Sequence, residues 1–153
     1  MRARVGYSRP KTATGIIRFF VHGSRSKAGA LTPTRLDQMV RSGLAMRELD
    51  DLRASLDLPM DRLTPKLGIS KATFHRRKAT GWLRKEESDR VVRFARLMGK
   101  AVDVFGNELN ARRWLTAPQY GLGGAAPLDF AETEVGAREV EDLLGRIEYG
   151  VYS

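Results

Sequence analysis

The side chains best suited to chemistry lie in the stretch 67–81, where cationic and hydroxyl groups alternate with small residues. Four residues there have the spacing i, i+3, i+4 and i+7, which places them on one helix face: Ala72, His75, Arg76 and Ala79. Arg and His side chains among small residues allow a helix to enter the major groove of DNA and hydrogen-bond with base edges. Arg77 and Lys78 flank this face, where they are placed to contact phosphates. The pattern therefore predicts a DNA recognition helix.

The residues around this helix distinguish it from an exposed basic helix that binds nothing. Gly68 provides the positive φ that a tight turn between two helices needs, and Ile69 is an apolar residue that follows the turn. Ser70 is a natural N-cap for the next helix. Phe74 lies roughly opposite the basic face, so we expect it to pack on the preceding helix.

Three apolar residues at helical spacing mark that preceding helix: Met60, Leu63 and Leu67. Pro59 is a start signal, whereas Pro65 conflicts with a helix interior. If Asp61 is the N-cap, Pro65 is the fourth helical residue, near the limit of what a helix start tolerates. Two helices joined at Gly68 predict a helix-turn-helix.

The net charge of +9 is concentrated in two parts of the 153-residue chain. Residues 1–43 carry nine basic and one acidic side chain, and residues 60–100 carry twelve basic and four acidic ones. The rest is acidic overall, including 134–153 with five acidic and two basic residues. Two basic blocks favour a polyanionic partner, and such binding would weaken steeply with salt.

No combination of residues predicts an enzyme, and we expect no catalytic residue, no metal and no cofactor. The chain has no cysteine, which excludes disulfides and thiolate chemistry and fits a reducing cytosol. His22 and His75 lack neighbouring metal ligands. The glycines at 121, 123 and 124 lack the Gly-Lys-Ser/Thr sequence of a phosphate-binding loop. The apolar run 16–21 is too short for a signal or membrane segment, so we expect a cytoplasmic protein.

The elements around these residues predict an all-α protein with one strand candidate, at 16–21. Apolar periodicity and end signals predict further helices at about 33–42, 45–57, 84–105, 108–116 and 136–149. We divide the chain into a basic N-terminal arm with a short helix near 33–42 (1–43), a helix-turn-helix module (44–106) and a C-terminal domain (107–153).

Five blocks of sequence, in this order, resemble the Xre/MbcA/ParS-type antitoxins, the partners of RES-domain toxins in bacterial type II toxin–antitoxin pairs. The blocks are LTPKLGISKATFHRRKATG at 63–81, EESDR at 86–90, VFG and ARRWLTAP within 104–118, GGAAPLDF at 123–130 and TEVGAREVEDLLGRIEYGVYS at 133–153. The resemblance covers about 44–153 and says nothing of residues 1–43.

The resemblance implies a helix-turn-helix that binds its own promoter and a helical C-terminal domain that blocks the cleft of a toxin consuming NAD⁺ or transferring ADP-ribose. Carried over by position, with Lys78 added as a flanking cation, the DNA contacts would be Ser70, Lys71, Thr73, His75, Arg76, Arg77 and Lys78. The toxin contacts would be Arg146, Glu148, Tyr149, Gly150, Val151, Tyr152 and Ser153.

Two other functions fit the same residues. A stand-alone helix-turn-helix regulator would use its C-terminal domain for dimerisation or sensing, and a general nucleic-acid-binding protein would rely on the basic arm. For this chain we expect a homodimer, which for an antitoxin would lie within a toxin–antitoxin hetero-oligomer, because paired modules read half-sites about one turn apart. The helix at 84–105 and Trp114 are our candidates for its interface.

Overall fold

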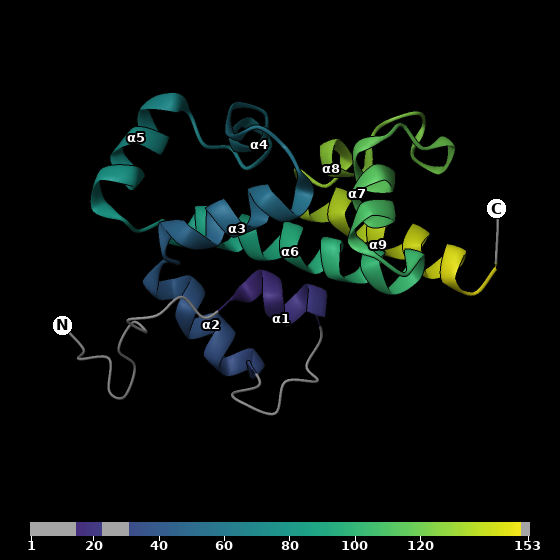
Figure 1. Cartoon of the computed structure of the whole chain (residues 1–153), viewed down its shortest axis with the longest axis horizontal. Coiled ribbons are helices and arrows are strands. Elements are labelled where there is room, and N and C mark those ends of the chain that lie inside the picture. The colour runs from purple at the N-terminus through teal and green to yellow at the C-terminus, as the bar shows by residue number, and fades with distance from the viewer. Residues whose placement is uncertain (1–14, 23–30, 151–153) are drawn as a thin grey trace.

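The computed structural model describes residues 15–22 and 31–150, which form helices joined by short loops (Figure 1). The first helices are α1 (Ile16–His22), α2 (Pro33–Ser42) and α3 (Met46–Leu56). They are followed by α4 (Met60–Lys66), α5 (Lys71–Thr80) and α6 (Lys85–Phe105). The C-terminal part contains α7 (Glu108–Thr116), the 3₁₀ turn η1 (Tyr120–Leu122), α8 (Pro127–Phe130) and α9 (Glu134–Glu148). No strand occurs in the described residues, which agrees with the all-α prediction.

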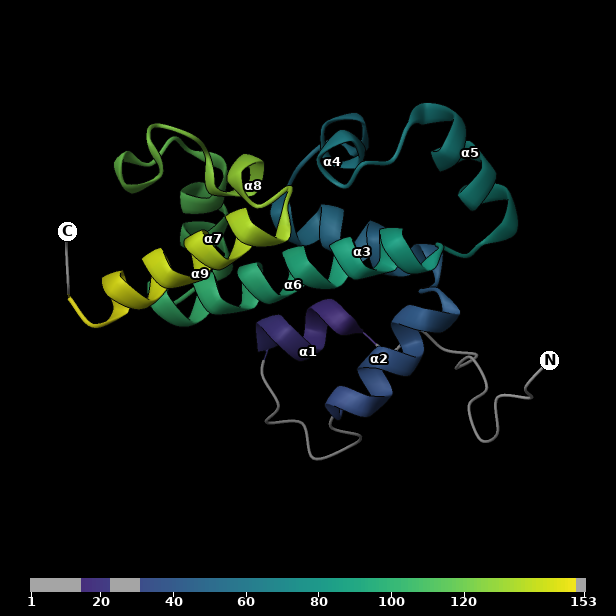
Figure 2. The ribbon, with the colours of Figure 1, turned by 180° about the vertical axis from the view of Figure 1, so that it is seen from behind.

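The long helix α6 is the centre of the fold, and other helices pack along its sides (Figures 1 and 2). It contacts α1, α2 and α3 from the first part of the chain and α7 and α9 from the last part. Its predicted apolar stripe lies inside the protein, where Val91, Ala95 and Met98 are fully buried. Neither α6 nor any other described helix is long and apolar enough to cross a membrane.

The helix at 84–105 and Trp114 stay predictions for a dimer interface, but the apolar side of this helix is not available for it. Helices of the same chain already cover that side. Trp114 is half-buried, and its ring centroid lies 5.4 Å from that of Phe105. An amphipathic pattern reports that a helix face is buried, but it does not report whether the same chain or a second copy buries it.

The expectation of a strand at 16–21 is also wrong, because this segment is the helix α1. Ile16, Ile17 and Val21 are buried, whereas Arg18 is exposed. Packing against α6 overrides the strand preference of β-branched and aromatic residues. Gly99 permits this contact, since a Cβ there would lie 2.2 Å from the carbonyl oxygen of Phe20. The rest of the expected arm, at 1–14 and 23–30, lies outside the described residues.

A buried carboxylate fixes the start of α1. Glu48, on α3, is only 2% exposed, and its Oε2 accepts a hydrogen bond from the backbone N–H of Ile16 at 3.1 Å. The other oxygen, Oε1, has no partner in the described structure. Burial raises the pKa of Glu48 to about 7, and the hydrogen bond from Ile16 offsets part of this rise.

Candidate nucleic-acid interface and partner surface

The turn between α4 and α5 has the local structure that its sequence predicts. Gly68 has a φ of +68°, and Ile69 is buried beneath the turn. The hydroxyl of Ser70 accepts a hydrogen bond from the N–H of Thr73 at 3.2 Å, so Ser70 is the N-cap of α5. Phe74 packs partly buried against the core, as expected. These contacts set the direction in which α5 leaves the body.

The expected N-cap of α4 is wrong by two residues. α4 begins at Met60 with Pro59 as its N-cap residue, so Asp61 is inside the first turn. Pro65 consequently lies in the last turn, where its missing N–H removes a hydrogen bond to the carbonyl of Asp61, and the helix ends one residue later at Lys66.

The basic face of α5 is free. The helix has no buried residue, and all four residues of the predicted stripe are exposed: Ala72, His75, Arg76 and Ala79. Lys71 and Lys78 are exposed as well, and Thr73 is half-exposed. The terminal nitrogen Nη2 of Arg76 donates to the hydroxyl of Thr73 at 3.1 Å. α5 stands out at one end of the molecule (Figure 1).

Arg77 differs from the other predicted DNA contacts, because its side chain is mostly buried in an ion pair. Its Nε lies 3.0 and 2.9 Å from the two carboxylate oxygens of Glu87, at the start of α6. The side chains of Arg77 and Glu87 are 11% and 9% exposed. The same carboxylate accepts from the backbone N–H of Arg84 at 2.9 Å. Arg77 therefore positions α5, and we correct its assignment as a phosphate contact.

Backbone contacts hold the segment that follows α5. Gly81 ends the helix with a φ of +82°, and its carbonyl accepts from the N–H of Met46 at 2.9 Å. Leu83 donates from its N–H to the carbonyl of Leu44 at 2.8 Å. Helix α5 is thus held at both of its ends, and the residues of its basic face remain exposed.

At the other end of the molecule, the chain is exposed from the last residue of α9 onward. Glu148 and Gly150 are exposed, Tyr149 is 81% exposed, and Arg146 is half-buried. The predicted toxin contacts at 151–153 lie outside the described residues. The last described residues are therefore not folded back into the core and are accessible to a partner.

The remainder of α9 is firmly attached to α6. Val140 and Leu144 are fully buried. On the polar side, Nε of Arg93 lies 3.1 Å from a carboxylate oxygen of Glu134, and Arg96 lies 3.7 Å from Glu141. Apolar packing with flanking ion pairs leaves only the last turn unsupported.

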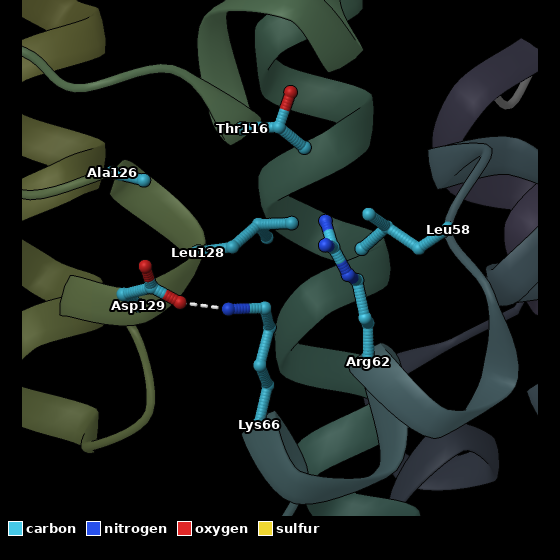
Figure 3. Close-up of a pocket in the computed structure, with 7 residues that line it drawn as sticks. All are labelled: Leu58, Arg62, Lys66, Thr116, Ala126, Leu128 and Asp129. Atoms are coloured by element: carbon cyan, nitrogen blue, oxygen red, sulfur yellow. Dashed lines mark hydrogen bonds and ion pairs between the residues drawn. The ribbon is translucent and has the colours of Figure 1, made fainter.

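A cavity of about 380 Å³ lies where the helix-turn-helix meets the C-terminal helices (Figure 3). Its lining residues are Leu58, Arg62, Lys66, Thr116, Ala126, Leu128 and Asp129. Lys66 of α4 forms an ion pair with Asp129 of α8 across it. Sequence reasoning did not find this contact, because no local signal connects two residues so far apart in the chain. The ion pair joins the two parts directly.

Models of known protein families match both parts. Residues 35–96 match the antitoxin Xre-like helix-turn-helix domain, and residues 100–150 match the antitoxin Xre/MbcA/ParS C-terminal toxin-binding domain. The chain belongs to the Xre antitoxin family. The two matched regions meet within α6, so one continuous helix, and not a linker, connects the DNA-binding and toxin-binding parts of this antitoxin.

Individual relatives agree with the family models. An antitoxin Xre of Yersinia enterocolitica is 38% identical over 122 residues, which is 78% of this chain and 82% of that protein. An antitoxin Xre of Photorhabdus laumondii is 33% identical over 120 residues, 77% of this chain and 81% of that protein. A protein of Sphingobium sp. named Prs ADP-ribosylating antitoxin is 26% identical over 125 residues, 75% and 79% of the two chains.

Proposed function

We propose that this antitoxin neutralises a RES-domain toxin that consumes NAD⁺ or transfers ADP-ribose, and that it represses its own promoter. The main support for the proposal is the separation of two exposed surfaces. The basic face of α5 and the last turn of α9 lie at opposite ends of the long axis (Figures 1 and 2). One molecule can therefore hold DNA and toxin together without steric conflict.

The DNA-binding part of the proposal rests on the exposed donors of α5. Lys71, His75, Arg76 and Lys78 are exposed, and Ser70 and Thr73 lie at the helix start where hydroxyls and N–H groups can meet phosphate. A pair of such helices in a homodimer would read two half-sites. Dimerisation would use a surface other than the apolar stripe of α6.

The toxin-binding part of the proposal rests on the C-terminal turn. A site for NAD⁺ must hold a pyrophosphate and is expected to be cationic, so the exposed carboxylate of Glu148 complements it. The name of the Sphingobium relative, an ADP-ribosylating antitoxin, supports this toxin class. The antitoxin itself would act in the bacterial cytoplasm by occupying the toxin, without chemistry of its own.

Deletion of residues 146–153 tests the toxin part. Co-expression with the RES-domain protein encoded beside its gene should be tolerated with the full chain and toxic with the truncated one. Binding to DNA from upstream of the gene should stay within about twofold, because α5 lies at the far end. Circular dichroism would establish that the truncated chain is folded. Neutralisation by the folded truncated chain would contradict the proposal.

A pair of substitutions in α5 tests the DNA part. Arg76→Ala should lower the ratio of specific to random DNA affinity by about tenfold, since a base contact is worth roughly 1–3 kcal/mol. Lys78→Ala, the matched removal of a flanking cation, should weaken binding to both DNAs alike. Titration of both DNAs at two salt concentrations measures the ratio. Equal behaviour of the two variants would exclude Arg76 from base reading.

A further inference from the structure

The loop between α7 and α8 exposes an aromatic side chain that the contacts described so far do not use. Tyr120, the first residue of η1, is 97% exposed, more than any other large hydrophobic residue in the described structure. Its neighbour Leu122 is buried, so the turn is anchored in the core while Tyr120 faces solvent.

The loop is held in one conformation by its own hydrogen bonds. Gln119 donates from its N–H to the carbonyl of Ala125 at 3.1 Å and accepts at its carbonyl from Gly124 at 2.9 Å. Its side-chain Nε2 donates to the carbonyls of Trp114 and Ala117 at 3.0 and 3.2 Å. Gly123 and Gly124 have the positive φ values that this path requires. Tyr120 is thus presented on a preorganised support, which lowers the entropy lost when a partner binds it.

The loop packs beside α9, toward its exposed end. A Cβ added at Gly121 would lie 3.1 Å from Cδ1 of Leu143, which places the two segments in close contact. Both views show the loop at the end of the molecule where α9 finishes (Figures 1 and 2). Tyr120 and Tyr149 are therefore two exposed tyrosines at the same end of the protein.

A stable interface requires more surface than the C-terminal turn alone provides. A stable protein complex buries about 800 Å² on each partner, from about 20–30 residues. The eight residues 146–153 supply only part of that number, so a toxin that binds them must also contact the body of the antitoxin. The loop lies within the region 100–150 that matches a toxin-binding domain. Tyrosine is among the residues that most often contribute the largest share of binding energy.

We propose that Tyr120 is a second anchor of the toxin interface, separate from the C-terminal turn. The inference rests on the proposed function, in which the partner is a RES-domain toxin. The toxin would place an apolar pocket over the phenol ring while its cleft receives the last residues of the antitoxin. The two anchors would then fix both the position and the orientation of the toxin.

Titration of the purified RES-domain protein encoded beside the gene with full-length variants tests this inference. Tyr120→Ala should raise the Kd by about 30-fold, and Tyr120→Phe should recover most of the affinity because the ring remains. Val135→Ala is the matched control, since Val135 is also exposed (76%) but sits at the start of α9. The thermal midpoint and DNA affinity of Tyr120→Ala should equal those of the unmodified protein.

The outcomes separate the two proposals. If the unmodified protein binds the RES-domain protein and Tyr120→Ala binds equally well, the proposed function stands and the second anchor is wrong. An equal loss in Tyr120→Ala and Val135→Ala would also overturn the anchor. If the unmodified protein does not bind at all, the RES-domain toxin is the wrong partner and both proposals fail.

Discussion

α5 and α9 both expose side chains for a partner, but the fold holds them in different ways. α5 has no buried residue and is held by the cap and turn at its start and by the Arg77–Glu87 ion pair at its end. α9 is packed on α6, with Val140 and Leu144 in the core, and the chain is exposed from Glu148 onward.

The difference follows from what each helix must contact. α5 leaves the side with His75 and Arg76 exposed and is attached at its two ends and through Phe74 on the opposite side. A helix that presents one terminus needs a fixed axis, so its side can be buried. Both helices are attached to α6. Substitutions at these contacts should therefore show how α5 and α9 differ in their attachment.

The largest effect is expected at Gly136, where α9 begins. A Cβ at this position would lie 1.7 Å from the carbonyl oxygen of Phe130, so the backbone must move. Gly136→Ala should lower the free energy of unfolding by about 3 kcal/mol or more. Gly145→Ala in the same helix meets nothing within 4 Å and should raise it by about 0.5–1 kcal/mol. Urea unfolding measures the change in the free energy of unfolding for both variants. A change of the same sign in both would contradict the packing of α9.

A smaller effect is expected from Glu87→Gln, which removes the charge that holds α5. Loss of a charge-assisted hydrogen bond at a mostly buried site costs about 2 kcal/mol. The loosened α5 should bind operator DNA about tenfold more weakly, although removal of a negative charge near DNA would by itself strengthen binding. Glu86→Gln is the matched control, because Glu86 is exposed in the same helical turn. Operator affinities that are equal for the two variants would show that Glu87 does not position α5.

The effect that is smallest at low pH is expected at Glu48, which lies in the body that both surfaces share. Because the folded-state pKa is raised from 4.5 to about 7, the folded state binds more protons than the unfolded one between these pH values. The contribution of Glu48 to stability is therefore fully present below pH 4.5 and is lost as the pH rises through 7. Glu48→Gln retains an oxygen acceptor for Ile16 without a charge.

The Glu48→Gln variant should match the unmodified protein at pH 5 and be more stable by about 2–3 kcal/mol at pH 8. Asp50→Asn, an exposed charge removal on the same helix, should show no such difference. Unfolding curves at the two pH values measure this. If the difference in the free energy of unfolding between Glu48→Gln and the unmodified protein does not grow from pH 5 to pH 8, burial does not raise the pKa of Glu48.

Where a structural feature depends on neighbouring residues, the sequence predicted it well. The N-cap at Ser70 and the turn at Gly68 both occur as expected, because a cap or turn is a contact over a few residues. Helical periodicity placed His75 and Arg76 on one side of α5, which is exposed, and Phe74 on the opposite side, where it is half-buried.

The errors arose where a residue's partner lies on another element. Arg77 was assigned to phosphate because nothing in its own helix indicates that Glu87 pairs with it across the following turn. The segment 16–21 was read as a strand because its β-branched and aromatic residues were judged without α6, against which they pack. The exposure of Tyr120 could not be predicted from the sequence, since exposure depends on how the whole loop folds.

The sequence by itself determined the helical class, the helix-turn-helix and the basic face of α5, because periodicity, capping residues and charge are local properties of the chain. The tertiary structure alone decided which cations are free and which are paired, and that α6 is covered by its own chain. It also decided that the two partner surfaces lie at opposite ends of the molecule. These properties depend on distances between side chains remote in the chain, which only the packing of α6 against its neighbours brings together.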